Sequence, residues 1–319
     1  MKKIILILVA SISGLVFAGG NSESDGGGSN QYTIGVALET FDDVFIQRVK
    51  DEVEKTAAIL GVRVVLVDGK SDPAEQVRQI ETFIANKVDA IIVHLINQDI
   101  AGTISEKAIT AEIPLVYMNQ SVPSTAVPPG KKVAIVASPE IEAGKGQAKY
   151  VVKTLAKKEI TSGNVVILLG GLGSPSQIGR TNGVKEYLAQ NAPEFKVIRE
   201  QTANWKRPDA VAVIENWLAS GDQFVAVFAN NDEMALGASL SLKEAGIRKE
   251  VLIVGVNANS DAVVAIGNGD IDMSMFQNGR AQGSGSVEVA VKMIKGESFS
   301  QTVDIPFEPV TKDNYSQYQ

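Results

Sequence analysis

The chain has 319 residues, of which 45% are apolar and 21% are charged, so it is long enough for one large or two medium globular domains. Its formal net charge of −7 argues against a nucleic-acid partner, because phosphate binding needs a dense lysine and arginine surface. It contains no cysteine, which excludes disulfides, thiolate catalysis and cysteine-ligated metal.

The first residues have the pattern of a cleaved export signal. Two lysines precede an apolar run over residues 4–17, and small residues at the end of this run place a cleavage site after Ala18. The alternative is a membrane anchor, but the run is short for a span of about 20 residues. We therefore predict a signal peptide over residues 1–18 and a periplasmic or otherwise exported protein. Residues 19–31 are rich in glycine and serine and predict a flexible leader.

Short apolar, β-branched runs alternate with longer amphipathic segments along the rest of the chain. Several runs are continuously apolar, which is typical of parallel strands covered on both faces. The predicted strands are residues 32–38, 63–67, 90–94, 115–118, 133–136, 165–169, 197–200, 224–228, 251–254 and 272–276.

The segments between these strands carry helix signals. Asp72 followed by Pro73 begins one predicted helix, and Asp232 begins another that stops at Gly246. Repeated strand–helix–strand units predict parallel sheets with right-handed crossovers. Ten strands are wide for a single open sheet, so we predict an α/β protein of two doubly wound parallel-sheet lobes that divide near Ala137.

Such sheets bind ligands at the carboxyl ends of their strands, so polar and aromatic residues directly after a predicted strand are candidates for a binding site. The candidates are Asp43, Phe45, His94, Asn119 and Gln120 in the first half, and Arg180, Trp205, Asn231, Asn257 and Gln277 in the second half.

Some candidates have a structural alternative. Either Asp42 or Asp43 is expected to cap the helix that follows, which leaves the other to accept ligand hydroxyls. His94 is the only histidine, and the chain has no HExxH or GxSxG pattern that would supply metal or catalytic partners, so it is either a structural residue or a ligand contact. Trp205 is either a hydrophobic plug or a plate for the C–H face of a sugar.

The second half leaves further alternatives open. One residue among Asn230, Asn231 and Asp232 must cap the next helix. The glycine-rich loop at residues 170–176 could cradle a phosphate, but it matches neither GxxxxGK[ST] nor GxGxxG. For Arg180, the alternative is an ordinary surface position.

The candidates share one chemistry. Amides, one carboxylate, one guanidinium and two aromatic rings suit a neutral ligand that is dense in hydroxyls. The set lacks a nucleophile–base pair and a carboxylate pair for glycoside cleavage, so we predict a binding protein that is not an enzyme and needs no cofactor or metal.

The chain resembles the periplasmic ribose/galactose-type sugar-binding proteins of ABC importers, which have the periplasmic binding protein type 1 fold, over nearly all of residues 32–310. The most specific match is FANNDEMALGA at residues 228–238, and residues 42–45, 72–76 and 255–257 support it. The resemblance implies that the ten candidates contact the ligand, with Asn119 and Gln120 less firmly implied. It also implies a neutral sugar or polyol as ligand, an ABC transporter permease as partner and a monomeric state.

The resemblance further implies a three-segment hinge. The N-terminal lobe would hold residues 32–137 plus 278–304, and the C-terminal lobe residues 138–277 plus 305–319. We expect Asp43 to face Arg180 and balance its charge. An exported sugar-processing enzyme and a ligand-presenting protein for chemotaxis are the alternatives on the same fold.

The chain departs from the family pattern at several positions. Asn257 stands where relatives usually have aspartate, Asn119-Gln120 where ribose-type proteins have Asp-Arg, and His94 where asparagine is common. Residues 159–163 lack the oxygen ligands of the calcium loop found in galactose-type relatives, so no calcium is expected there. The particular sugar therefore stays open among xylose, ribose, galactose, glucose and myo-inositol.

Overall fold

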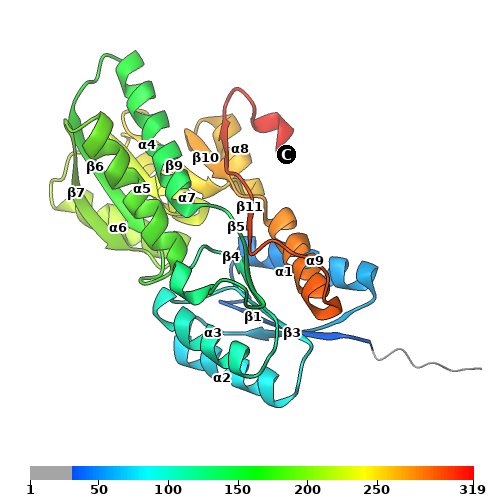
Figure 1. Cartoon of the computed structure of the whole chain (residues 1–319). Helices are drawn as coiled ribbons and strands as arrows, with labels where there is room; N and C mark the ends of the chain where they lie inside the picture. Colours follow the sequence, from blue (N-terminus) through cyan, green and yellow to red (C-terminus); the bar gives the residue numbers. More distant parts are fainter. Residues whose placement is uncertain (1–30) are drawn as a thin grey trace, which may run out of the picture. The chain divides into compact units, whose positions relative to one another are not determined.

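The structure is a computed structural model that describes residues 31–319, which form two six-stranded sheets with helices on both faces (Figure 1). The predicted signal peptide at residues 1–18 and the leader up to residue 30 lie outside this described part. Among the described residues, no helix has both the length and the apolar character needed to cross a bilayer.

The first sheet buries side chains on both of its faces. Its parallel strands are β1 (Thr33–Leu38), β2 (Arg63–Asp68), β3 (Ala90–Val93), β4 (Leu115–Asn119), β5 (Val133–Ala137) and β11 (Thr302–Asp304). One face is covered by α1 (Val44–Leu60) and α9 (Gly279–Lys295) and the other by α2 (Pro73–Ala85) and α3 (Ala101–Thr110). The short 3-10 helices are η1 (Gln98–Ile100) and η2 (Ser124–Ala126).

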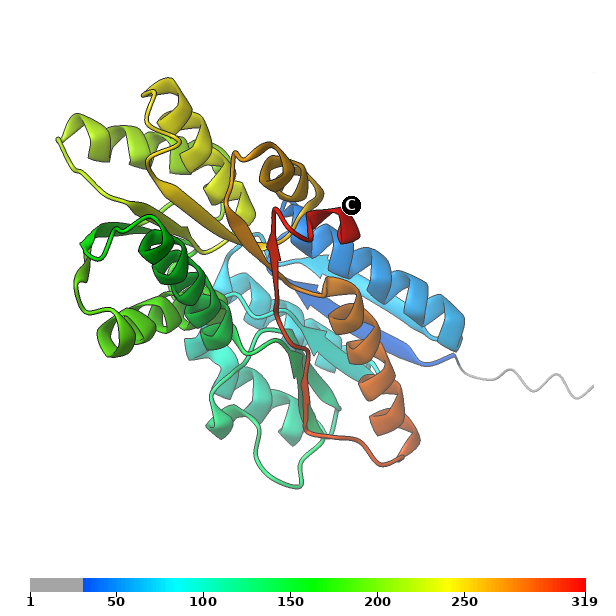
Figure 2. The same ribbon diagram turned by 90° about the horizontal axis from the view of Figure 1, so that it is seen from above.

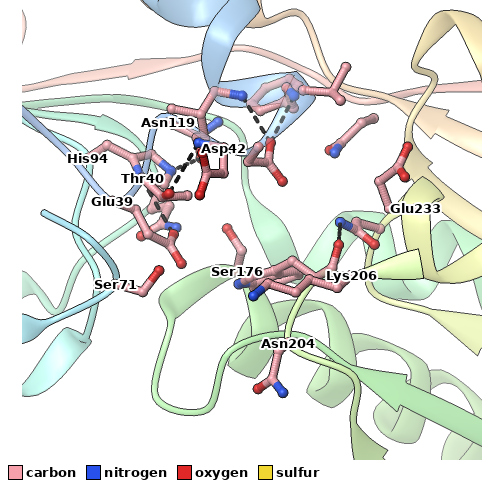
Figure 3. A pocket seen from close by; sticks show the side chains of 18 of the residues that line it. Glu39, Thr40, Asp42, Ser71, His94, Asn119, Ser176, Asn204, Lys206 and Glu233 are labelled. Carbon is pink, nitrogen blue, oxygen red and sulfur yellow. Dashed lines mark hydrogen bonds and ion pairs between the residues drawn. The ribbon is translucent and has the colours of Figure 1, made fainter. Parts of the chain in front are cut away.

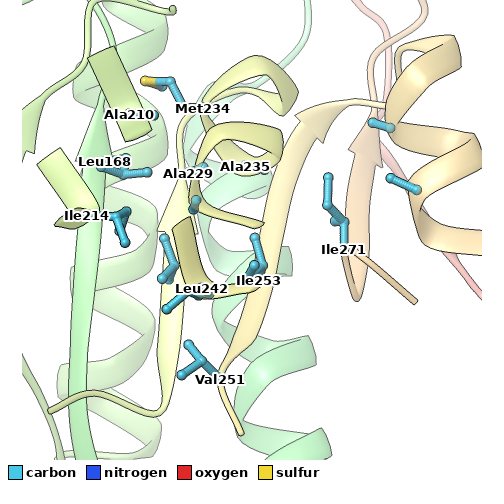
Figure 4. Packing of buried hydrophobic residues seen from close by; sticks show 14 of the residues in the cluster. Leu168, Ala210, Ile214, Ala229, Met234, Ala235, Leu242, Val251, Ile253 and Ile271 are labelled. Atoms are coloured by element: carbon cyan, nitrogen blue, oxygen red, sulfur yellow. The ribbon is translucent and has the colours of Figure 1, made fainter. Parts of the chain in front are cut away.

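The second sheet has the same layered construction. It contains the parallel strands β6 (Gly163–Leu169), β7 (Phe195–Thr202), β8 (Ala226–Ala229), β9 (Leu252–Asn257) and β10 (Met273–Phe276), and the antiparallel edge strand β12 (Glu308–Thr311). One face is covered by α4 (Glu140–Lys157) and α5 (Pro175–Asn191) and the other by α6 (Arg207–Ala219), α7 (Asp232–Glu244) and α8 (Ser260–Asn268), and η3 (Tyr315–Gln317) lies near the end. Figure 4 shows part of the hydrophobic core between the second sheet and helices α6, α7 and α8, where Ile214, Met234 and Ile253 are buried.

All ten predicted strands are present, with ends shifted by a few residues. The edge strands β11 and β12 were not predicted. They have three and four residues, and β12 contains Pro309, so neither gives an apolar run long enough to be recognised in the sequence.

The two sheets have matching strand orders, β2-β1-β3-β4-β5-β11 and β7-β6-β8-β9-β10-β12. Each therefore reverses its direction of winding once, between β1 and β3 and between β6 and β8, and ligands of doubly wound sheets bind at such points. The chain passes between the sheets at residues 138–139, 277–278 and 305–307 (Figure 2). These three crossings confirm two lobes joined by a three-segment hinge, while the residue boundaries of the lobes stay a prediction.

Candidate functional site

A cleft of about 480 Å³ lies where the carboxyl edges of the two sheets face each other (Figure 3). The structure brings all ten predicted site residues to this cleft, namely Asp43, Phe45, His94, Asn119, Gln120, Arg180, Trp205, Asn231, Asn257 and Gln277. Each lies at or shortly after the end of a strand, or on the helix that follows. The expectation that candidate residues gather at the carboxyl ends of the strands, here called the strand-end rule, therefore located them correctly. Their contact with a ligand stays a prediction.

On the first lobe's wall, Asp43 has two roles. Its Oδ1 accepts hydrogen bonds from the backbone N–H groups of Phe45 (2.8 Å) and Ile46 (3.0 Å), so Asp43 is the residue that caps α1. The same side chain lines the cleft, and burial raises its pKa. Asp43 is therefore the cap among the two candidates, and because Asp42 also lines the cleft, which of the two carboxylates contacts a ligand stays a prediction. Phe45 also lines the cleft, and its ring packs in the hydrophobic core of the first lobe.

His94 is a buried, neutral imidazole. Its Nε2 donates to Asn119 Oδ1 at 2.9 Å, and burial lowers its pKa to about 4. Its Nδ1 lies 3.7 Å from Oε2 of Glu39 and has no hydrogen-bond partner among residues 31–319. The side-chain amide of Asn119 in turn donates to Oε1 of Gln282 at 2.7 Å. His94 and Asn119 are thus part of a hydrogen-bonded network at the wall of the cleft.

On the second lobe's wall, Arg180 is almost fully buried and is held by several groups. Its Nε lies 2.6 Å from Glu140 Oε2, Nη1 donates to the carbonyl oxygen of Asn230 at 2.6 Å, and Nη2 donates to Gln277 Oε1 at 3.1 Å. Nη2 also donates to Glu140 Oε1 at 3.3 Å. These bonds use four of the five guanidinium N–H groups. The expectation that Asp43 balances the charge of Arg180 is wrong, because the buried carboxylate of Glu140 balances it.

Trp205 lies across the glycine-rich loop after β6. A Cβ atom at Gly170 would collide with its ring, so this loop needs glycine for the indole to lie there. The centre of the Trp205 ring is 5.9 Å from Cζ of Arg180. Asn231 holds the backbone of Trp205 through a bond of 3.0 Å from Nδ2 to the carbonyl oxygen, while its Oδ1 caps α7 by accepting from Met234 N–H at 3.0 Å. Of the three residues that the sequence offered as the cap of this helix, the structure therefore identifies Asn231.

Three of the predicted residues have left-handed backbone conformations. The φ angles are 74° at Asn119, 66° at Trp205 and 113° at Asn257. Asparagine tolerates positive φ better than most residues, whereas tryptophan does not. Backbone strain of this kind concentrates at functional sites, where the surrounding structure holds it in place.

Hydrogen bonds join the two lobes across the cleft. The backbone N–H of Gln98 in η1 donates to the carbonyl oxygen of Gly173 at 3.0 Å, and Gln120 Nε2 donates to Ser174 Oγ at 3.3 Å. Gly173 has a φ of 85°, and an added Cβ would lie 2.5 Å from Nδ2 of Asn97. The loop after β6 therefore makes close backbone contact with the opposite lobe.

The structure adds residues to the site that the sequence prediction missed. Glu39 follows β1 directly and lines the cleft, so the strand-end rule could have found it. Burial, followed by the nearby charge of Asp43, raises the pKa of Glu39 to about 8. Glu140 and Gln282 lie on helices just beyond the hinge crossings, and no feature of the sequence marks them.

The outer part of the cleft carries both signs of charge. Arg207 pairs with Glu233 at 3.1 Å, and Lys206 lies beside them. Within residues 31–319, no group of three histidine, aspartate or glutamate side chains comes together in a way that could hold a metal ion. The arrangement is one of hydrogen-bond donors and acceptors around aromatic rings, which suits binding of a polar ligand.

Comparisons with known proteins agree with this geometry. Residues 34–298 match the model of the family described as the periplasmic binding protein domain. A protein of Rhizobium meliloti, named as a candidate rhizopine-binding protein, is 38% identical over 322 residues, covering 100% of this chain and 99% of the relative. The xylitol-binding protein of Mycolicibacterium smegmatis is 32% identical, covering 98% and 86%.

A solved structure is also similar. An ABC transporter solute-binding protein of Bacillus halodurans, crystallised with bound myo-inositol, superposes with a TM-score of 0.84 at 34% identity, covering 92% of this chain and 98% of that protein. The fold, the cleft and the family match over residues 34–298 together show that the chain belongs to the periplasmic binding protein family, whose members bind solutes and are not enzymes.

Proposed function

We propose that this chain is an exported solute-binding protein of an ABC-type importer, which binds a neutral monosaccharide or cyclic polyol in the interlobe cleft. The observation that carries this proposal is the convergence of ten polar and aromatic side chains from both lobes on one cleft of about 480 Å³. Protein sites for small molecules have volumes of roughly 300–1,000 Å³ and combine apolar walls with a few convergent polar groups.

The distribution of donors and acceptors supports a ligand rich in hydroxyl groups. On one wall, Glu39 and Asp43 offer oxygen acceptors, and on the other wall Arg180 keeps one N–H group beyond the four bonds it makes with described residues. A hydroxyl can donate to the first wall and accept from the second. Because Glu140 already neutralises Arg180, this guanidinium does not call for an anionic ligand.

The relatives favour polyols within this class. The Bacillus halodurans protein was crystallised with myo-inositol, and the Mycolicibacterium smegmatis relative is a xylitol-binding protein. We therefore place cyclic polyols first and pentoses or hexoses second. Each buried hydroxyl pairing contributes roughly 1 kcal/mol net, so several such pairings are consistent with micromolar affinity, about −8 kcal/mol.

Binding would act through closure of the lobes. In the proposal, residues 32–137 plus 278–304 and residues 138–277 plus 305–319 move as two bodies about the three crossing segments. A ligand that touches both walls favours the closed form. The hydrogen bond from Gln98 to Gly173 and that from Gln120 to Ser174 would add to the stability of the closed form.

The cellular setting is part of the same proposal. The signal-peptide pattern at residues 1–18 would direct export, and the rims of a closed monomer would then dock on a membrane permease.

A thermal-shift screen of the purified protein against pentoses, hexoses and inositols tests this function. A ligand that binds only the folded state raises apparent stability by about 2.7 kcal/mol at a hundredfold excess over Kd. We expect a rise in the unfolding temperature with at least one neutral polyol or sugar, and recovery of that ligand chemically unchanged. A flat response to the whole panel would contradict the proposal.

A further inference from the structure

Glu39 has an unusual position for a glutamate. It lines the cleft directly after β1, only 7% of its surface is exposed, and no lysine or arginine among the described residues forms an ion pair with it. Two polar groups face its carboxyl, namely the indole N–H of Trp205, which favours the ionised form, and the imidazole of His94, whose Nδ1 lies 3.7 Å from Oε2. Burial makes an ionised carboxylate costly, so the state of Glu39 depends on what Trp205 and His94 present to it.

A chain of hydrogen bonds fixes the tautomer of His94. It starts at the first hinge crossing, where Ser138 Oγ accepts from Gln282 Nε2 at 2.8 Å. On the other side of the same amide, Gln282 Oε1 accepts from Asn119 Nδ2 at 2.7 Å. Asn119 is then oriented so that its Oδ1 faces His94 Nε2 at 2.9 Å. An amide oxygen can only accept, so the proton of the neutral imidazole sits on Nε2 and Nδ1 keeps a lone pair.

Because His94 Nδ1 keeps a lone pair, we expect the Glu39 carboxyl that faces it to carry a proton. If Glu39 were ionised, two acceptors would face each other in a buried site, and Nδ1 would remain without a partner among residues 31–319. Asp43 disfavours ionisation of Glu39, whereas the indole N–H of Trp205 and the charge of Arg180, which is already bonded to Glu140, favour it. Burial is the largest effect, and together these effects raise the pKa of Glu39 to about 8, so the carboxyl is protonated at neutral pH.

We propose that Glu39 is a specificity-determining ligand contact that acts as a neutral carboxylic acid, donating its proton to His94 Nδ1 and accepting a ligand hydroxyl with its other oxygen. Asn119 and Gln282 are positioning residues, because the direction of their hydrogen bonds sets the tautomer of His94. The proposed hydrogen bond requires this 3.7 Å separation to shorten to about 3.2 Å or less.

The consequence concerns the class of ligand. A neutral acid at this wall suits an uncharged hydroxyl, whereas a cationic group would require the ionised carboxylate. This inference rests on the proposed function, because it names the chemistry with which the same cleft reads its ligand.

The first test needs no ligand. In tag-free protein labelled with ¹⁵N-histidine, His94 is the only histidine, so the spectrum reports this ring alone. We expect a pyrrole-type Nε2 and a pyridine-type Nδ1 at pH 7. Gln282→Met should shift the ring toward the other tautomer, and Gln282→Glu, which keeps an acceptor for Asn119, should restore it. A pyrrole-type Nδ1 in the wild type would overturn the inference.

The carboxyl of Glu39 can be observed in the same way. With ¹³C-labelled glutamate, we expect one carboxyl that titrates with a midpoint near pH 8 and is missing in Glu39→Gln. If the signal lost in this variant titrates in the ordinary glutamate range, Glu39 is an ionised residue and the inference is wrong, whatever the cleft binds.

The second test uses myo-inositol as the probe in titration calorimetry. Glu39→Leu should weaken binding at least tenfold, and Glu39→Gln, whose amide mimics the protonated acid, should recover most of that loss. Equal losses in both variants would show that the negative charge is needed. If the wild type gives no heat with myo-inositol or any sugar in the panel, the proposed function fails, and the two NMR experiments still decide the state of Glu39.

Discussion

The side chains of Arg180 and Glu140 form a buried ion pair, with Nε 2.6 Å from Oε2 and each side chain no more than 4% exposed. Glu140 begins α4 immediately after the first hinge crossing, and Arg180 lies on α5 at the wall of the cleft. Ser176 Oγ also donates to Glu140 Oε1 at 2.8 Å. The pair therefore connects the ligand-facing wall to the hinge and neutralises the cation before any ligand arrives.

Removal of one member of this pair should be strongly destabilising. Glu140→Gln leaves the buried guanidinium without a counter-charge, and we expect a loss of about 3–5 kcal/mol in the free energy of unfolding. Urea denaturation measures this loss. The control is Glu142→Gln on the same helical turn, whose partner Lys145 is at the surface, and it should change stability by less than about 1 kcal/mol. Equal effects of the two substitutions would contradict the structural role of Glu140.

The two tryptophans should report differently on ligand binding. Trp205 lines the cleft, whereas Trp217 is buried in the core of the second lobe. We expect the ligand to change the intrinsic fluorescence of the wild type and of Trp217→Phe, and to leave that of Trp205→Phe almost unchanged. Trp205→Ala should in addition weaken binding about tenfold or more, because it removes the aromatic plate. A ligand-induced signal that persists in Trp205→Phe would place the ligand elsewhere.

Closure should depend on the absence of a side chain at Gly173. An added Cβ there would press on Asn97 of the opposite lobe, so Gly173→Ala should favour the open form. Reducing the closed population lowers the apparent affinity for the ligand in proportion, so we expect the Kd to rise about tenfold. In the presence of ligand, small-angle X-ray scattering should give a larger radius of gyration for this variant than for the wild type.

Gly221→Ala is the matched control for this substitution. Gly221 has a similar φ of 82°, but an added Cβ would meet no atom within 4 Å, so its backbone strain is comparable and it makes no contact across the cleft. Its Kd should stay within a factor of two of the wild type. Equal weakening of binding in both variants would show that the close approach of Gly173 to Asn97 does not control closure.

The dependence of stability on pH should carry a signature of Glu39. Its folded-state pKa of about 8 lies above the unfolded value of 4.5, so the folded protein binds more protons between these values. Stability from this group is therefore greatest below about pH 4.5 and falls as pH rises toward 8. Burial also raises the pKa of Asp232 to about 7, so the stability that Asp232 contributes decreases over part of the same pH range. The lowered pKa of His94 has the opposite effect on stability at lower pH.

Subtraction separates Glu39 from these other groups. The difference in unfolding free energy between the wild type and Glu39→Gln should decrease steadily from pH 5 to pH 8, as measured by urea unfolding at several pH values. A difference that does not vary with pH would show that Glu39 is not protonated in the folded protein.

The sequence predicted the fold well because the strands are short apolar runs separated by capped helices, such as the helix that begins after Asp72. It also predicted the place of ten cleft residues, because parallel sheets expose their strand ends at one edge. It did not predict β11 and β12, which are too short for periodicity to be visible.

The residues that hold the cleft side chains in place could not be predicted from the sequence. Glu140 and Gln282 lie on helices far along the chain from the residues they hold, and their proximity to Arg180 and Asn119 follows only from how the lobes fold back through the hinge. For Asp43, the sequence predicted the place at the cleft but left open whether this residue or Asp42 caps α1.

Titration calorimetry with variants from both walls tests the two-walled cleft most directly. The ligand selected by the thermal-shift screen should bind the wild type one to one with micromolar or tighter affinity. Phe45→Ala on the first lobe and Trp205→Ala on the second should each weaken that binding at least tenfold while the protein remains folded. Undiminished affinity in both variants would show that the solute does not bind between the lobes.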